Sequence, residues 1–200
     1  MNFKINKFAV AGLDEAGRGA WAGPVVAATV LSRANKKISP SLLNSVRDSK
    51  QLSVKKREAL FEQIINSDLI IGVGRASAKE IDQINILQAT FLAMRRALNN
   101  ISVVPKLLLV DGNQQLPEWH GNQKAIIKGD QLEFLIAAAS IIAKVTRDKI
   151  MINLSKSLPG YYFEVHKGYG TKVHQKSLQQ LGVSNEHRLT YRPIKELTRA

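Results

Sequence analysis

The chain of 200 residues has no cysteine, no long hydrophobic run and a shortage of acidic side chains. Without cysteine there can be no disulfide framework, thiolate zinc site, iron–sulfur cluster or cysteine nucleophile, which is compatible with a reducing cytoplasm. No apolar run approaches the ~20 residues that span a bilayer, and the apolar segment 8–13 is too short for a signal peptide. We therefore expect a cytoplasmic protein that makes no membrane contact.

The charged residues are strongly biased toward the positive sign. Lysine and arginine total 29 against 16 acidic residues, a net charge of +13. Residues 33–57 hold eight basic residues and one acid, and residues 151–200 hold eight against three, with aromatic residues interleaved. Such a surface attracts polyanions, of which nucleic acid is the commonest in a cell. The alternative is an ordinary basic protein with solvated charged faces.

The apolar pattern predicts one α/β domain followed by a small helical appendage. Short apolar runs at 8–13, 25–31, 69–73, 106–110 and 123–128 are typical of strands. Helical spacing covers 54–65, 85–98 and 132–154, with Ser53 as the N-cap of the first of these helices. Strands that alternate with helices favour an α/β layer fold. Because Pro159 and Gly160 break the pattern, we expect one domain over 1–156 and a helical region over 157–200.

Acidic residues follow three of the predicted strands. Asp14 and Glu15 end the first strand, Asp111 ends the 106–110 strand, and Asp130 follows the next. Functional groups collect beyond strand ends in open α/β sheets. Four carboxylates that converge there would repel one another unless a cation lay between them. Oxygen ligands of this kind predict Mg²⁺ or Mn²⁺, whereas solvated turn residues are the simpler alternative.

Two further features concern the chain just after the first acids. Neighbouring side chains on a regular strand face opposite ways, so Asp14 and Glu15 share one metal site only if the strand breaks there. Gly17 and Gly19 favour such a break. Glycines on both sides of Arg18 also let the backbone approach a ligand closely, and the guanidinium can fork onto a phosphate. Taken alone, this tripeptide could be a flexible turn.

Blocks along nearly the whole chain resemble the bacterial ribonuclease HII family, which belongs to the type 2 ribonucleases H. In family order they are GLDEAGRG at 12–19, AGPVV at 22–26, DSKQLS at 48–53, EID at 80–82, NIL at 85–87, VDGN at 110–113, KGD at 128–130, AASIIAKVTRD at 138–148 and HKGY at 166–169. The resemblance implies an RNase H-like fold, with a central mixed β-sheet flanked by helices. Residues 1–156 would be the catalytic domain, and 157–200 would be a C-terminal helical region that helps to bind substrate.

The resemblance also implies an activity. The family hydrolyses the RNA strand of RNA–DNA hybrids and nicks duplex DNA at embedded ribonucleotides. By two-metal-ion catalysis with Mn²⁺ or Mg²⁺, it would leave 5′-phosphate and 3′-hydroxyl ends. The expected partners are therefore a hybrid or a ribonucleotide-containing duplex, with the protein acting as a monomer.

The same resemblance assigns roles by position. The catalytic, metal-binding set would be Asp14, Glu15, Asp111 and Asp130. The 2′-hydroxyl at the RNA–DNA junction would be read by Gly17, Arg18 and Gly19, and the adjoining deoxyribose would pack on Tyr169. Weaker candidates for contacts to phosphate or to the acidic cluster are Lys50 and the pair Lys144 and Arg147.

Some positions depart from the family pattern. Ala20 and Trp21 stand where the family more often has Pro-Leu, Gln51 replaces a usual lysine, and Glu133 could compete with Asp130 as the fourth acid. Two other functions stay open, a non-catalytic nucleic-acid-binding module of the same fold and another nuclease or ATPase of the wider fold. An ATPase would need a glycine-rich phosphate loop that the sequence does not contain.

Overall fold

A mixed β-sheet of five strands forms the centre of the protein, in a computed structural model that describes residues 9–33, 38–47 and 53–198. In sheet order the strands are β3 (Ile70–Ala76), β2 (Val25–Ser32), β1 (Val10–Ala16), β4 (Leu107–Asp111) and β5 (Gln123–Ile126). β2 is antiparallel to β1 and β3, whereas β1, β4 and β5 run parallel. The predicted α/β class is confirmed.

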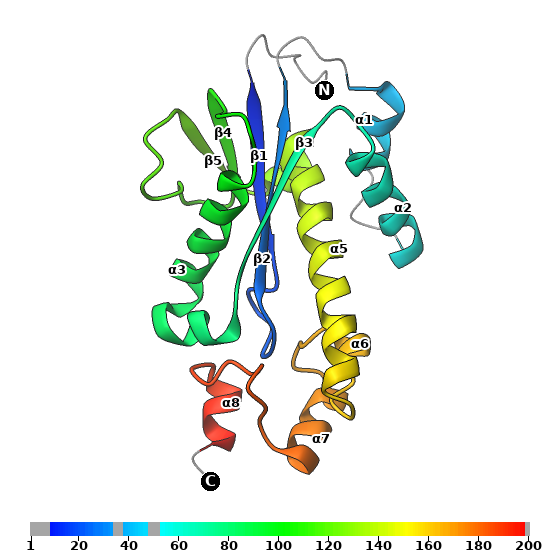
Figure 1. Ribbon diagram of the computed structural model, residues 1–200, viewed down its shortest axis with the longest axis vertical. Helices are drawn as coiled ribbons and strands as arrows, with labels where there is room; N and C mark the ends of the chain where they lie inside the picture. Colours follow the sequence, from blue (N-terminus) through cyan, green and yellow to red (C-terminus); the bar gives the residue numbers. More distant parts are fainter. Residues whose placement is uncertain (1–8, 34–37, 48–52, 199–200) are drawn as a thin grey trace.

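Two long helices cover the two faces of this sheet. In Figure 1 the sheet is seen nearly edge-on, with α3 (Ala78–Asn99) on one side and α5 (Phe134–Ser157) on the other. The α5 side is extended by α1 (Pro40–Arg47) and α2 (Val54–Ile65). The short helices are α4 (Gly129–Leu132), α6 (Phe163–His166), α7 (Lys172–Leu181) and α8 (Arg192–Leu197). No helix among the described residues is long and apolar enough to cross a membrane.

The central strands are buried on both faces because successive side chains alternate between two hydrophobic clusters. On β1, Val10 packs in the cluster beneath α5, while Ala11 and Leu13 pack in the cluster beneath α3. Gly12 faces the start of α5, where an added Cβ would lie 2.2 Å from the backbone carbon of Leu135. This glycine therefore allows α5 to pack directly against β1, which brings the helix close to the strand end that carries the acids.

The helix boundaries differ from the sequence-based prediction in two places. α3 begins before the predicted residue 85, because Ser77 and Glu80 form a reciprocal capping box, and it kinks at Asn85 with φ 64°. The predicted helix over 132–154 corresponds to α5, which begins only at Phe134 because Glu133 has extended dihedrals and separates it from α4. The helix over 54–65 is confirmed, with Ser53 as its N-cap.

The C-terminal helices lie together at one end of the sheet, at the bottom of Figure 1. Their small apolar cluster includes Tyr161, Phe163, Leu178 and Ile194, and it also takes in Ala22 and Met151. Because Ala22 follows β1 and Met151 belongs to α5, this region packs directly on the turn that leaves the acidic strand end. The proposed boundary between residues 156 and 157 stays a prediction.

Candidate active site

The acids come together because β1 and β4 are parallel neighbours. Their register pairs Leu13 with Val110, which places Asp14 and Asp111 at the next position on each strand. α4 then brings the chain back to the end of β4, where the backbone N–H of Asp130 donates to Oδ1 of Asp111 at 3.3 Å. The structure therefore brings together the ends of the three predicted acidic segments.

Burial and mutual repulsion make these carboxylates hard to ionise. Asp14 is only 6% exposed, and burial raises its pKa well above the usual value. The charges of Glu15 and Asp111 raise the pKa of Asp14 further, while a hydrogen bond with Ser140 of α5 acts in the opposite direction. Burial likewise raises the pKa of Glu15 and of Asp111. Since the negative charge of Asp130 adds to the effect on Asp111, all four acids belong to one electrostatic cluster.

The four acids form no ready-made metal cage. No three acidic or histidine side chains among the described residues are arranged to hold a metal ion. The expected strand break at the acidic pair is wrong, because β1 remains regular through Ala16 and the turn starts at Gly17. Oδ1 of Asp14 accepts a hydrogen bond from the backbone N–H of Glu15 at 2.7 Å, whereas the Glu15 side chain accepts one from Arg18 Nη1 at 3.1 Å.

The donor chemistry of the cluster nevertheless fits a hard divalent cation. Every candidate ligand is a carboxylate oxygen, the type that Mg²⁺ and Mn²⁺ prefer. A cation would also relieve the repulsion that raises the pKa of Asp14 and Asp111. The backbone N–H of Asp130 donates to Asp111, and the charge of Asp130 raises the pKa of Asp111, which favours Asp130 over Glu133 as the fourth acid of the cluster.

The 17–24 loop follows these acids directly. Gly17 has φ 95°, and a Cβ there would lie 1.9 Å from Nε of Arg147, so this position accepts only glycine. A Cβ on Gly19 would meet no atom within 4 Å, which leaves the space beside its backbone open. Arg18 has half of its side chain exposed. The loop thus presents backbone and one cation beside the acidic cluster.

Two buried arginines support the backbone of this loop from the interior of the protein. Arg147 is 1% exposed and Arg188 is fully buried. Arg147 donates to the backbone carbonyls of Ala22, Pro24 and Lys167 at 2.9–3.1 Å. Arg147 therefore supports the backbone, and the suggestion that it contacts phosphate or the acidic cluster is wrong. Its sequence partner Lys144 forms an ion pair with Asp148 at 2.8 Å.

Comparison with known proteins gives the family. The Ribonuclease HII family profile matches residues 11–194. The chain belongs to this family. Ribonuclease HII of Endomicrobium trichonymphae is 49% identical over 190 residues, which cover 95% of this chain and 88% of that protein. Ribonuclease HII of Caldicellulosiruptor bescii is 47% identical over 182 residues, 91% of this chain and 85% of the relative.

Solved structures agree with this assignment. The crystal structure of ribonuclease H2 from Pyrococcus horikoshii has a TM-score of 0.78 at 28% identity, over 96% of this chain and 97% of that one. The structure of Bst-RNase HIII in complex with Mn²⁺ has a TM-score of 0.74 at 17% identity, over 98% of this chain and 71% of that one, which bears on the fold alone. The chain is therefore a ribonuclease H-type nuclease with the RNase H fold.

Three buried histidines of this chain contact one another, which the sequence did not predict. His166 and His174 stack with ring centroids 4.3 Å apart, and Nε2 of His174 lies 3.0 Å from Nε2 of His187. Burial lowers the pKa of both His174 and His187 to about 4. Their spacing in the sequence gave no signal, because they meet only when α6, α7 and the following turn fold together.

The hydrogen bonds of these neutral histidines determine their tautomers. Nδ1 of His187 accepts from the backbone N–H of Ser184, so its proton lies on Nε2 and points to His174. His174 must accept at Nε2, and its Nδ1–H therefore donates to the carbonyl of Tyr169 at 3.0 Å. The chain of donors runs in one direction and ends at the residue that the family resemblance assigns to the deoxyribose.

Tyr169 and Lys50 complete the predicted site residues. The Tyr169 side chain is partly exposed, and the guanidinium carbon of Arg147 lies 5.4 Å from the centre of its ring. Tyr169 is thus placed beside the 17–24 loop, which Arg147 also contacts. Lys50 lies outside the described residues, as does Gln51.

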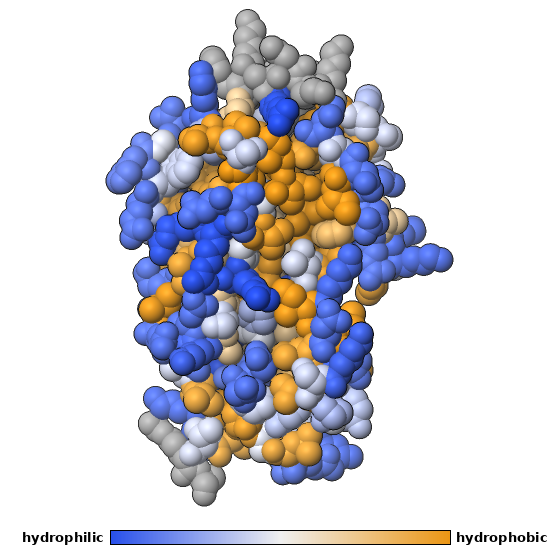
Figure 2. Space-filling model, in the orientation of Figure 1, coloured by the Kyte–Doolittle hydropathy of each residue, from blue (hydrophilic) through white to orange (hydrophobic). Residues whose placement is uncertain are grey.

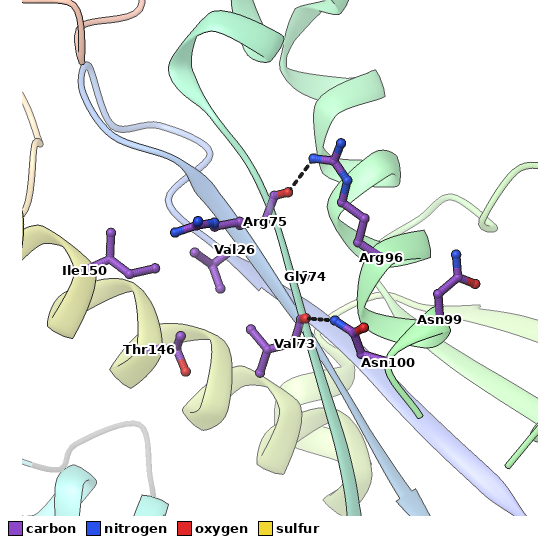
Figure 3. Close-up of a pocket in the computed structure, with 9 residues that line it drawn as sticks. All are labelled: Val26, Val73, Gly74, Arg75, Arg96, Asn99, Asn100, Thr146 and Ile150. Carbon is purple, nitrogen blue, oxygen red and sulfur yellow. Dashed lines mark hydrogen bonds between the residues drawn. The ribbon is translucent and has the colours of Figure 1, made fainter. Parts of the chain in front are cut away.

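A groove between α3 and α5 is separate from the acids. The groove lies at the edge strand β3, has a volume of about 550 Å³ and has none of the four acids in its wall; Figure 3 shows the residues that line it. There Arg96 donates to the carbonyl of Arg75 and Asn100 to that of Val73, which covers the open strand edge. The face seen in Figure 2 has hydrophobic residues along its middle and hydrophilic ones along both sides.

Proposed function

We propose that this chain hydrolyses the RNA strand of RNA–DNA hybrids and cuts duplex DNA beside an embedded ribonucleotide. The products would carry 5′-phosphate and 3′-hydroxyl ends. The observation that carries the proposal is the electrostatic coupling of Asp14, Glu15 and Asp111 at the ends of two parallel strands. Carboxylates held this close are costly in a folded protein unless they bind cations, so a purely structural role does not account for them.

Asp14, Glu15, Asp111 and Asp130 would hold the metal ions, with Mn²⁺ or Mg²⁺ as the ion type. Two such ions would acidify the attacking water and stabilise the departing 3′-oxygen. The protein's own contribution is to fix the ligands: the backbone N–H of Glu15 orients Asp14, and the backbone N–H of Asp130 orients Asp111. Glu15 would have to release the guanidinium of Arg18, which would then be free to meet a substrate phosphate.

Selection for RNA would depend on the 17–24 loop and on Tyr169. The open space beside Gly19 lets a sugar reach the backbone, and the 2′-hydroxyl is the group that distinguishes RNA from DNA. Polar groups that require this hydroxyl can reject the deoxy analogue by roughly 10⁴–10⁵-fold. Tyr169, held at its carbonyl by His174, would pack on the adjoining deoxyribose.

Phosphates along the duplex would be held by basic residues without reading of sequence. The C-terminal region from residue 157 supplies part of this surface, and Lys50 is a further candidate. We also propose that the protein acts as a monomer in the cytoplasm.

A cleavage assay tests the proposal against the rival of a non-catalytic binding module. The substrate is an end-labelled DNA duplex with one ribonucleotide, incubated with Mg²⁺, with Mn²⁺ or with EDTA. We expect one metal-dependent cut beside the ribonucleotide, with no cut in the all-DNA duplex and none by Asp111→Asn. Binding without cleavage in every metal would establish the rival and refute the proposal.

A further inference from the structure

Arg188 has an unusual environment for an arginine. Its side chain is fully buried, yet none of the described carboxylates forms an ion pair with it. The guanidinium instead donates to three backbone carbonyls of the 17–24 loop: Gly17 at 2.7 Å, Arg18 at 2.9 Å and Gly23 at 2.9 Å. Burying a cation is costly, and only a set of well-aligned acceptors offsets that cost.

The surroundings keep this guanidinium in place. The hydroxyl of Tyr191 accepts from Nη1 of Arg188 and itself donates to the carbonyl of Arg18. The backbone N–H of Arg188 donates to the carbonyl of Trp21 at 2.8 Å. The two residues that follow Arg188, Leu189 and Thr190, donate backbone hydrogen bonds to the carboxylate of Asp82 in α3. Arg188 is therefore held between α3 and the loop.

The direction of the carbonyls determines what the loop presents outward. In a trans peptide the C=O of one residue and the N–H of the next point in opposite directions. Because the carbonyls of Gly17 and Arg18 point to Arg188, the amide N–H groups of Arg18 and Gly19 point away from it. Among the described residues, none accepts a hydrogen bond from either amide. The open space beside Gly19 lies on this part of the loop.

We propose that Arg188 is a positioning residue for ribose recognition, because it turns two carbonyls inward and so presents two amide donors to the 2′-hydroxyl. This inference rests on the proposed function. The oxygen of the hydroxyl can accept from these amides, whereas a deoxyribose leaves them without a partner in a desolvated site. If the guanidinium were absent, the peptide planes could rotate and offer carbonyls instead, which would weaken selection for RNA.

Two variants of different severity test the proposal. Arg188→Lys replaces a planar fork by a single ammonium, which cannot span the three carbonyls. Tyr191→Phe removes only the hydroxyl that supports Arg188 and the Arg18 carbonyl, and it keeps the ring. Arg95→Lys is the matched control, since Arg95 of α3 lies outside the 17–24 loop and the basic segments and forms an ion pair with Glu118 at 3.5 Å.

The measurements are kcat and KM on a duplex with one ribonucleotide, and Kd in EDTA for this duplex and for its all-DNA equivalent. For Arg188→Lys we expect kcat to fall roughly tenfold to a hundredfold, the loss typical of a missing hydrogen bond to a charged group. The preference for the ribonucleotide-containing duplex should decrease in parallel, while Kd for the all-DNA duplex changes less than about twofold. Tyr191→Phe should show a smaller loss of the same kind, and Arg95→Lys should match wild type.

Other outcomes overturn the inference. If Arg188→Lys and Tyr191→Phe retain wild-type kcat and preference, Arg188 does not position the loop for recognition. If Arg188→Lys and Tyr191→Phe lose affinity for both duplexes equally, the contacts only stabilise the fold. A lowered Tm of Tyr191→Phe identifies that case even where Arg188→Lys fails to fold. If wild type binds but does not cut, the proposed function fails, which is distinct from either result with the variants.

Discussion

The acidic cluster and the 17–24 loop are adjacent in the chain but differ in how their polar groups are satisfied. Burial and repulsion raise the pKa of Asp14, Glu15 and Asp111, and these side chains form no finished metal site among the described residues. The loop has its inward carbonyls paired with Arg147 and Arg188. The polar groups of the loop are thus satisfied within the protein, whereas the acids have the charge and the ligand type that a divalent cation would satisfy.

This difference has a physical cause. Carboxylates bind cations more strongly when they are crowded, but the crowding itself destabilises the protein while the cations are absent. Recognition of a neutral hydroxyl offers no comparable electrostatic reward, so its donors must be aligned in advance. The acidic side chains therefore repel one another in the folded protein, whereas the backbone groups of the loop are already aligned.

The largest expected effect concerns the acids. Asp14→Asn removes a buried carboxylate on which the charges of both Glu15 and Asp111 act, and metal-dependent stabilisation of the transition state is worth several kcal/mol. We expect kcat to fall by ~10³-fold or more, since each ~1.4 kcal/mol is a factor of ten. Duplex binding in EDTA should survive, as measured by fluorescence anisotropy. Full cleavage by this variant would remove the metal-binding interpretation.

A fall in pH should destabilise the protein through the two buried histidines beside the loop. His174 and His187 have pKa values lowered to about 4, so in the window from about 6.5 to 4 the unfolded chain binds more protons than the native one. Each histidine then removes about 1.4 kcal/mol of stability per pH unit as the pH falls. The raised pKa values of Asp14 and its neighbours act in the opposite sense, because the native protein then binds the extra protons.

The difference in unfolding free energy between wild type and a histidine variant separates the contribution of the histidines from that of the acids. Urea unfolding of wild type and His187→Gln from pH 7 to 4 cancels the common contribution of the acids. The stability advantage of wild type should shrink steadily below pH 6.5, because glutamine does not titrate. A constant difference between wild type and His187→Gln would contradict the buried, neutral histidines.

Divalent cations should stabilise the acidic half of the site. At a concentration 100 times the Kd, a ligand that binds only the native state contributes about 2.7 kcal/mol. For a protein of this size, that corresponds to a rise in Tm of roughly 5–10 °C. Mg²⁺ and Mn²⁺ should raise the Tm of wild type in a thermal melt, and Asp111→Asn should blunt the rise. A Tm that changes with neither ion would argue against the site.

The two glycines of the loop should respond differently to alanine. Gly19→Ala meets no neighbour, so we expect its free energy of unfolding to stay within about 0.5 kcal/mol of wild type. Its kcat/KM should still fall ~10-fold, because the methyl group keeps the sugar away; a 1 Å misplacement can cost ~10²-fold. Gly17→Ala should instead destabilise the fold, because its Cβ would overlap Arg147. Unchanged cleavage by Gly19→Ala would place the sugar elsewhere.

The smallest expected effect belongs to Tyr169. Loss of the ring in Tyr169→Ala removes a packing contact worth about 1 kcal/mol, or roughly fivefold in rate. We expect nicking at a lone ribonucleotide to suffer more than cleavage within a long RNA strand, where neighbouring positions can be cut. Tyr169→Phe retains the ring and should behave as wild type in the same two assays. Equal losses on both substrates would refute a role at the junction.

Local pattern was enough to predict the main elements. The apolar runs that became β2, β4 and β5, and the helix capped by Ser53, depend on neighbours within a few residues. The predicted positions of Asp14, Asp111 and Asp130 after strands also follow from this pattern, since parallel strands end at a common edge. The continuation of β1 through Ala16 could not be predicted, because pairing with β2 keeps the strand regular despite the glycines that follow.

The sequence by itself determined the α/β class, the positive charge, the ribonuclease HII family and the acids that end the strands. Only the tertiary structure decided what Arg147, Arg188 and the three histidines do. Nε of Arg147 reaches a carbonyl 123 residues away, and Nη2 of Arg188 reaches one 171 residues away. Periodicity and turn chemistry arise from neighbours along the chain, whereas such contacts exist only after the C-terminal helices have packed against the 17–24 loop.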